Sequence, residues 1–178
     1  MMNRLGLKSI SLICLICASV ITAEAQPATS STVTGHITAE VISTLAATET
    51  TQLSFGRFSP GPQGGKLILT PESSISVMGS VWPGSGTHSA ASFYVTGDPG
   101  VAYTISLPSA PVTITHIGSA RTMRVEDWRS VPEAEPGAGM LENGSQIVYV
   151  GATLSVGTLN DNPVGIYTGT YTITFEFN

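Results

Sequence analysis

Residues 167–178 read "YTGTYTITFEFN" and alternate between apolar and polar side chains over their whole length. Successive side chains of a β-strand point to opposite faces. The alternation therefore predicts one strand over residues 167–177, with one face on a core and the other in water. At ~3.4 Å per residue this strand would be about twice as long as a typical one. Its apolar face comprises Tyr167, Gly169, Tyr171, Ile173, Phe175 and Phe177.

A second alternating stretch, "TVTGHITAEV" at residues 32–41, lies near the other end of the chain. It would extend over ~34 Å, enough to pair with most of residues 167–177. Burial of three of its aliphatic side chains would contribute about 1.5 to 3 kcal/mol each, a sum comparable to the ~5 to 15 kcal/mol net stability of a domain. Two interpretations stay open: the segment is the first strand of the protein's own sheet, over residues 32–45, or it fills the sheet of a neighbouring molecule. The apolar set is Val33, Gly35, Ile37, Ala39 and Val41.

Turn-forming motifs recur between these two stretches, among them "SPGPQGG" at residues 59–65, "ENGS" at residues 142–145 and "NDNPVG" at residues 160–165. Short runs rich in Val, Ile, Thr, Tyr and Phe separate the turns. This pattern predicts an all-β fold of about ten short antiparallel strands, packed as two sheets around one core. The expected strands cover residues 32–45, 52–58, 66–70, 74–78, 91–96, 101–107, 112–117, 122–126, 146–150, 153–156 and 167–177.

Residues 1–25 have the pattern of a secretory signal peptide: Arg4 and Lys8 precede an apolar run, and a small-x-small cleavage site follows. The apolar run is shorter than the roughly 20 residues that a membrane-spanning helix needs, and no later run is longer. We therefore expect export to the periplasm, the cell surface or the extracellular space, and no transmembrane segment. A single domain is expected over residues 26–178.

The part after the predicted leader is acidic and contains no cysteine. Cys14 and Cys17 both lie within residues 1–25, so the domain is expected to depend on its core rather than on a disulfide. Five Lys and Arg residues stand against eleven Asp and Glu residues, a net charge of −6. Such a surface repels phosphate backbones, which excludes nucleic acid as an expected partner.

No pattern of catalytic or metal-binding residues is found in the sequence. His36, His88 and His116 are far apart and lack the spacing of metal ligands. The serines form neither a GxSxG nor an SxxK motif. We expect no enzymatic activity, no catalytic residue, no metal site and no cofactor.

An alternative function follows from two tryptophans and one long loop. Residues 130–144 contain Pro, Gly and Glu without an apolar period, so they are expected to form an exposed loop. Trp82 and Trp128 are expected near loops, where an aromatic ring can contact a sugar. On this interpretation the protein is a monomeric surface adhesion module that binds a glycan or another protein.

Four stretches together resemble the bacterial domain of unknown function 4402 family: "LSFGRFSPGPQGGKLILTP", "ASFYVTGDPGVAYTISLPSAPVTI", "TMRV" and "VGATLSVG" followed by "PVGIYTGTYTITFEFN". The resemblance covers about residues 32–178. That family is similar to spore-coat-U-type and fimbrial subunits. It implies a single immunoglobulin-like β-sandwich and a secreted or surface-exposed structural protein, fimbrial or pilin-like in kind.

The resemblance to fimbrial subunits also implies a mode of assembly. Such subunits carry a glycine fourteen residues from the C-terminus, an aromatic penultimate residue and an alternating N-terminal extension with a glycine. Gly165, Phe177 and Gly35 match these positions. The implied partners are other copies or related subunits, together with a periplasmic chaperone and an usher. In that system a donated strand completes each sandwich. The strand-donating face would be Val33, Gly35, Ile37, Ala39 and Val41, and the accepting strand would begin after Gly165.

Overall fold

The computed structural model describes residues 30–42 and 44–177. The chain divides into two units, residues 1–40 and 41–178, and each is described by itself. The predicted leader, residues 1–25, lies outside the described residues. All eleven strands belong to the second unit. The described residues contain no helix, and so none that is long and apolar enough to cross a membrane. The prediction of an all-β fold is confirmed.

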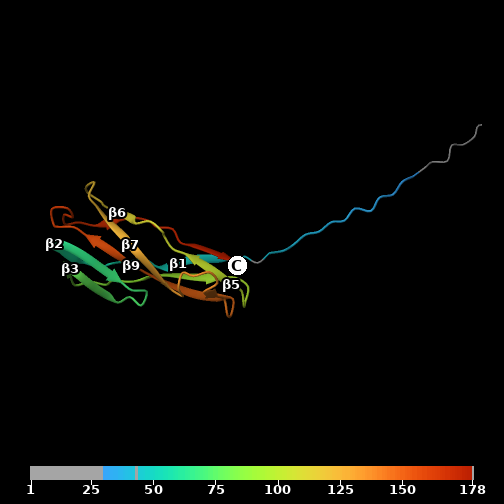
Figure 1. The fold of residues 1–178 in the computed structure, drawn as a ribbon, viewed down its shortest axis with the longest axis horizontal. Coiled ribbons are helices and arrows are strands. Elements are labelled where there is room, and N and C mark those ends of the chain that lie inside the picture. The colour runs from blue at the N-terminus through green and yellow to red at the C-terminus, as the bar shows by residue number, and fades with distance from the viewer. Residues whose placement is uncertain (1–29, 43, 178) are drawn as a thin grey trace, which may run out of the picture. The chain divides into compact units, whose positions relative to one another are not determined.

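Eight antiparallel strands form the larger sheet, which curls strongly around the core (Figure 1). The long strand β9 is central: β4 and then β2 pair along one of its edges, and β7 pairs along the other. Across the sheet the order is β1 (Ala46–Thr51), β4 (Ala91–Thr96), β9 (Ser145–Val156), β7 (Thr122–Val131), β6 (Val112–His116) and β10 (Tyr167–Thr168). The strand β2 (Phe58–Leu69) also pairs with β3 (Ile75–Pro83).

The smaller sheet has three strands in the order β11 (Thr174–Phe177), β5 (Ala102–Ser106) and β8 (Gly139–Met140). Its middle strand places Tyr103 and Ile105 in the core, where they are 0% and 2% exposed. The strand β8 lies inside the stretch that was expected to be a loop over residues 130–144. Because β8 is only a two-residue pairing, no alternating pattern in the sequence marks it.

The core consists of two clusters of buried side chains, and the inward face of β9 contributes to both. Val148 and Val150 belong to one cluster, and Ala152 and Leu154 belong to the other. Leu53 and Trp128 pack against both clusters. The two clusters therefore form one continuous apolar layer, as expected for a sandwich with a single core.

The strand β7 is longer than the expected strand over residues 122–126, because it continues through a β-bulge. Its register shifts between Glu126 and Arg129, and Asp127 has a φ of 52°. The extra residue reverses the alternation, so that Val125 before the bulge and Ser130 after it are both buried. The bulge also places Trp128 among the core clusters rather than in a loop.

The "SPGPQGG" motif does not form the expected turn, because it lies within β2. The register of β2 against β3 shifts between Pro60 and Gly65, and Gly64 has a φ of 67°. A Cβ atom at Gly61 would overlap Ser80 of the paired strand. The glycines therefore permit an irregular, closely packed strand instead of a chain reversal.

Two more predicted boundaries differ from the structure. The strands expected over residues 146–150 and 153–156 are one strand, β9, because Gly151 fits where the backbone of Leu69 approaches closely. The strand expected over residues 52–58 is reduced to an isolated bridge between Ser54 and Ser89. This second difference opens the groove described next.

Candidate assembly groove

A groove of about 960 Å³ runs between the segment that follows β1 and the last segment of the chain. One wall is formed by Leu53, Phe55 and Phe58, and the other by Tyr167, Tyr171 and Ile173. All six side chains are only half-buried, although they pack against the two core clusters. The floor is formed by Phe93 of β4, Val112 and Ile114 of β6, and Met123, Val125 and Trp128 of β7.

The last segment is not the single strand that was expected over residues 167–177. It begins as β10, which pairs with β6 of the larger sheet, and ends as β11, which pairs with β5 of the smaller sheet. Residues 169–173 between them belong to no strand. The first half of the segment pairs with the larger sheet and the second half with the smaller sheet, so the chain crosses from one sheet to the other between them. Gly169 allows the change, since a Cβ atom there would lie 2.7 Å from the carbonyl oxygen of Thr113.

The side chains of this last segment nevertheless face the core in the predicted order. Tyr167 packs against one cluster, and Tyr171, Ile173 and Phe175 pack against the other. No residue from 163 to 177 is fully buried, and Tyr167, Tyr171, Ile173, Phe175 and Phe177 are all half-buried. We call residues 167–177 the accepting segment. Its apolar side chains contact the core on one side and remain partly exposed on the other.

In the described part of the chain, each strand that borders the groove pairs with a neighbouring strand along one edge only. β10 pairs with β6 alone and β11 with β5 alone, while β1 across the groove pairs with β4 alone. Each of these is therefore a sheet edge that presents backbone N–H and C=O groups. The groove lies between two sheet edges that can accept a further strand.

Trp128 and Tyr171 meet inside the groove, with ring centroids 4.7 Å apart. Trp128 Nε1 and the Tyr171 hydroxyl are buried and have no hydrogen-bond partner among the described residues. Burial raises the pKa of the Tyr171 hydroxyl well above its ordinary range, and the nearby Glu49 carboxylate raises it further. The hydroxyl therefore stays protonated. Two buried donors without acceptors are an energetic cost to the domain.

Gly165 lies in the loop before β10, at one end of the groove, where it makes room for the ring of His116. A Cβ atom at Gly165 would overlap the imidazole ring. The Gly118 N–H donates to His116 Nδ1 over 2.9 Å, so Nε2 carries the ring proton and donates to the Val164 carbonyl, 3.2 Å away. The His116 ring also packs edge-on against Tyr167. Gly165 is therefore needed to hold the loop against the start of the accepting segment.

The proposed donor segment was expected to be a strand over residues 32–45, but the structure shows no strand in residues 30–42 or at residues 44 and 45. Val33, Ile37 and Val41 are 86%, 97% and 97% exposed. Gly35 and Ala39 lie in the same exposed stretch. An alternating segment of this kind has no ladder partner among the described residues.

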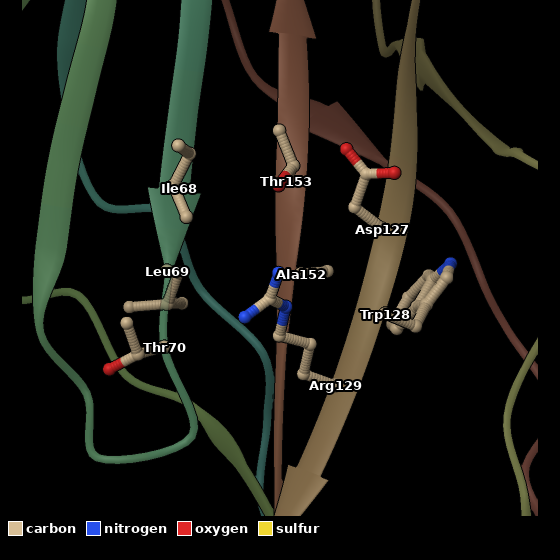
Figure 2. Close-up of a pocket in the computed structure, with 8 residues that line it drawn as sticks. All are labelled: Ile68, Leu69, Thr70, Asp127, Trp128, Arg129, Ala152 and Thr153. Atoms are coloured by element: carbon tan, nitrogen blue, oxygen red, sulfur yellow. The ribbon is translucent and has the colours of Figure 1, made fainter. Parts of the chain in front are cut away.

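A second depression, of about 510 Å³, lies on the face of β2, β9 and β7 (Figure 2). Its lining includes one acid, Asp127, and one base, Arg129, beside Thr153. Among residues 30–42 and 44–177, no three His, Cys, Asp or Glu side chains gather where they could hold a metal ion.

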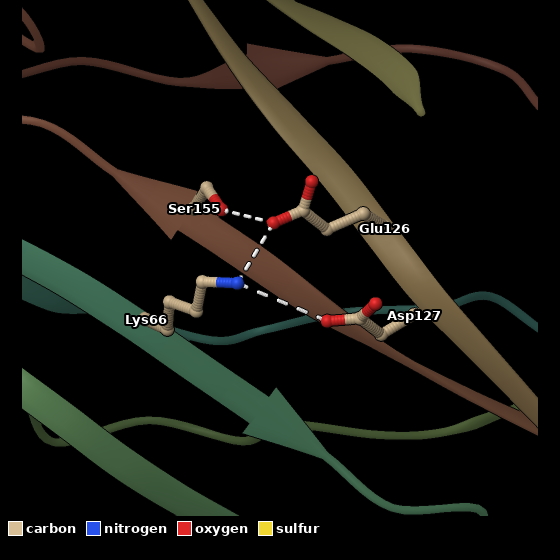
Figure 3. A network of polar contacts seen from close by, with 4 residues as sticks. All are labelled: Lys66, Glu126, Asp127 and Ser155. Carbon is tan, nitrogen blue, oxygen red and sulfur yellow. Dashed lines mark hydrogen bonds and ion pairs between the residues drawn. The ribbon is translucent and has the colours of Figure 1, made fainter. Parts of the chain in front are cut away.

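A polar cluster crosses the same three strands (Figure 3). Lys66 Nζ lies 2.9 Å from Glu126 Oε1 and 3.8 Å from Asp127 Oδ2, and the Ser155 hydroxyl donates to Glu126 Oε1 over 2.8 Å. The hydrogen bond from Lys66, followed by that from Ser155, holds the pKa of the Glu126 carboxyl below its usual value. These contacts join β2, β9 and β7, so the cluster has a structural explanation.

Residues 45–177 match the family described as domain of unknown function 4402 (DUF4402), and the chain belongs to this family. The match begins just before β1 and includes both walls of the groove. The alternating segment at residues 32–41, which the resemblance was expected to include, precedes the matched residues. No curated protein and no solved structure matches the chain.

Proposed function

We propose that this protein is a non-enzymatic structural subunit that assembles with other copies by β-strand donation. In this assembly, residues 32–41 of one copy fill the groove of the next copy. The observation that carries the proposal is the open groove itself, whose half-buried apolar walls lie between two sheet edges. A domain with a completed sandwich would cover these walls.

The donor segment and the groove are complementary in period and in polarity. A strand with Val33, Ile37 and Val41 on one side would place three aliphatic side chains against the aromatic walls, with Gly35 and Ala39 between them. These side chains are almost fully exposed, so nearly all of their apolar surface is available for burial. The opposite side of the segment is polar and would face water.

Backbone hydrogen bonds would add to this burial. A strand laid along β10 and β11 would pair with their outer edges, which is the usual mode of β-augmentation. Both the apolar and the polar character of the groove thus fit an extended peptide.

The cellular setting belongs to the same proposal. A signal peptide at residues 1–25 would export the chain, and assembly would take place in the periplasm or at the cell surface. A periplasmic chaperone would cover the groove before assembly, and an usher would direct the exchange, as the similarity to fimbrial subunits implies. Such a chaperone would prevent the exposed sheet edges from aggregating.

Replacement of Ile37 by Lys tests the donor side. The charged side chain cannot enter the groove, so we expect a folded protein that gives a single band on electrophoresis without boiling. His36→Lys is the matched control, because it adds the same charge on the polar side of the same segment and should preserve a heat-sensitive ladder. A ladder from Ile37→Lys equal to that of the unchanged chain would refute the proposal.

A mixing experiment tests donor and acceptor together. Phe55→Lys places a charge in the groove wall and should abolish acceptance while leaving residues 32–41 intact. Neither Ile37→Lys nor Phe55→Lys should polymerise alone. Their mixture should form dimers and nothing larger, because it contains one working donor and one working groove. Absence of that dimer, with both proteins folded by circular dichroism, counts against strand donation.

A second candidate function, a surface module that binds a glycan or a protein, is favoured by one observation. Tyr94, Ile147, Tyr149 and Val131 are cross-strand neighbours on β4, β9 and β7, and each is between 42% and 46% exposed. Trp82 is 58% exposed, whereas Trp128 lies in the groove and is not available in a loop. Binding of the Ile37→Lys monomer to a glycan array, lost in Tyr149→Ala, would support this candidate.

A further inference from the structure

Four exposed aliphatic side chains gather at one end of the domain. Ile117, Leu159, Val164 and Ile166 are 69%, 52%, 88% and 67% exposed, and we call them the aliphatic cap. The Ile117 N–H donates to the Ile166 carbonyl over 2.9 Å, which joins the turn after β6 to the loop before β10. Three of the four residues also line the end of the groove, and Ile117 lies outside it.

The loop that carries three of the four cap residues is held in place by partly buried hydrogen bonds. Asn162 is 4% exposed; its Oδ1 accepts from the Gly157 N–H over 2.6 Å, and its Nδ2 donates to the Thr122 carbonyl over 2.9 Å. The Tyr167 hydroxyl donates to the Pro163 carbonyl over 2.9 Å. The backbone is thus fixed while its aliphatic side chains face solvent. A fixed and uncovered apolar surface of this kind is typical of an interaction site.

The chain enters the domain at the end opposite the cap. β1 begins at Ala46, which pairs with Thr96, and the accepting segment ends at Phe177, which pairs with Tyr103. In Figure 1 the start of β1 and the last described residues of the chain lie toward the same end of the domain. The accepting segment therefore runs from the cap, at Tyr167, toward the end where β1 begins.

The direction of the inserted segment distinguishes a domain that fills its own groove from a domain whose groove is filled by a neighbour. Only residues 42–45 lie between Val41 and Ala46, so Val41 can be at most roughly 18 Å from the start of β1. If the segment filled its own groove, Val41 would lie at the Phe177 end, and the segment would run parallel to the accepting strand. A segment that runs antiparallel to the accepting strand must come from another molecule.

We propose that the neighbour's segment inserts antiparallel to the accepting strand and that the neighbour's domain docks on the aliphatic cap. This inference rests on the proposed strand donation and names the surface on which the second copy is placed. In the antiparallel direction Val41 of the neighbour lies at the cap. Its short connection to β1 then brings the neighbour's domain against Ile117 and Val164.

Two features of the domain favour this direction over the parallel one. Every ladder in both sheets is antiparallel, and antiparallel pairing is slightly the more stable per residue. In parallel insertion, the two domains would also meet through the same end of each, the end at which β1 begins. That end carries the carboxylate of Glu142, in a turn that is joined to the turn after β4 by the bonds from Gly97 to Gly144 and from Gly100 to Leu141. Like charges across such a contact oppose association.

The cap is tested with full-length Ile37→Lys protein as the acceptor, because this variant keeps its groove and cannot polymerise. Adding Ile117→Ser, at the one cap position outside the groove lining, should weaken its association with a full-length donor by about fivefold or more, since this aliphatic side chain loses its burial. Its affinity for a synthetic peptide of residues 32–41 should change by less than about twofold, because the peptide carries no domain to dock. Ile147→Ser, on the outer sheet face, is the matched control.

The outcomes separate the two proposals. If the peptide fails to bind the acceptor, strand donation itself is wrong. If the peptide binds and the cap variant associates with the full-length donor as tightly as the Ile147→Ser control does, strand donation survives and the docking surface is wrong.

Cysteine cross-linking tests the direction, and the absence of cysteine outside residues 1–25 makes it specific. A donor with Glu40→Cys should form an intermolecular disulfide with an acceptor that carries Thr168→Cys, near the cap. A disulfide with Glu176→Cys instead would show parallel insertion and overturn the inference. Both acceptor positions are exposed; Thr168 lines the groove near the cap, and Glu176 lies outside the groove lining.

Discussion

The rings of Trp128 and Tyr171 pack with centroids 4.7 Å apart and planes inclined by 34°, where β7 and the last segment face each other across the groove. Tyr171 is there because the last segment alternates, and Trp128 because a bulge at Asp127 reverses the alternation of β7. Each residue has a buried polar atom without a hydrogen-bond partner in the described structure. A strand bound in the groove would therefore change the surroundings of these two rings.

Filling the groove should change the fluorescence of Trp128. In a Trp82→Phe, Ile37→Lys background, Trp128 is the only tryptophan of the chain. A peptide of residues 32–41 should shift its emission to shorter wavelength, because the peptide excludes water from a half-buried ring. A titration followed by fluorescence measures the effect.

The control for this titration is the same peptide with Ile37 replaced by Lys, which should leave the emission unchanged. A shift of equal size with the control peptide, or no shift with the unchanged peptide while binding is seen by calorimetry, would show that the segment does not occupy the groove beside Trp128.

Gly165→Ala should destabilise the domain by about 1 to 3 kcal/mol, as expected for a side chain forced into a packed contact. Its methyl group would overlap the ring of His116, which holds the Val164 carbonyl. Urea denaturation of the Ile37→Lys monomer measures the loss. The double variant with His116→Ala is the informative comparison: once the ring is absent, the added cost of Gly165→Ala should fall, and the part that remains reflects the φ of 158° at Gly165, which residues with a side chain rarely adopt. Equal costs in both backgrounds would show that the ring is not the cause.

The sequence predicts the faces of the strands better than their partners. Alternation is a local property, and it correctly places Tyr171, Ile173 and Phe175 toward the core. It contains no information about which sheet a segment joins, so the change of sheet at residues 169–173 was not predicted. That change depends on the close approach of Gly169 to the backbone of Thr113, a contact between segments far apart in the chain.

The apolar alternation of the last segment was predicted, and its side chains face the core. The opposite wall of the groove was expected to be a strand over residues 52–58, and Trp128 was expected near a loop. The bulge in β7 requires a positive φ at Asp127, which is not glycine, so no turn residue marks it. The donor segment is a strand by its pattern, yet residues 30–42 form none. Strand structure there requires a partner edge, which an alternating pattern alone does not supply.

Alkaline pH should destabilise the domain through Tyr103. This side chain is fully buried, its hydroxyl donates to Gln146 Oε1 over 2.7 Å, and burial raises its pKa to about 12. An unfolded tyrosine ionises near pH ~10, so the stabilisation is complete below that pH. It is lost at about 1.4 kcal/mol per pH unit as the pH rises toward the folded value. Urea denaturation at pH 9, 10 and 11 measures the slope.

Tyr103→Phe should reduce this alkaline slope without abolishing it, because burial also raises the pKa of Tyr171. Tyr94→Phe, on the exposed outer face, is the matched control and should leave the slope unchanged. Identical slopes for Tyr103→Phe and the unchanged chain would mean that Tyr103 ionises alike in the folded and unfolded states.

Acid should weaken the contact that joins β2, β9 and β7 through Glu126. The hydrogen bond from Lys66, and then that from Ser155, lowers the pKa of this carboxyl in the folded state. The contribution of Glu126 is therefore complete above the pKa of an unfolded glutamate, near ~4.3, and is lost as the pH falls through the lower folded value. Thermal unfolding of Glu126→Gln between pH 6 and pH 3 should depend less on pH than that of the unchanged chain. Glu133→Gln, in the exposed loop, should behave like the unchanged chain, and an equal pH dependence in all three proteins would show that the Lys66 contact does not stabilise the fold.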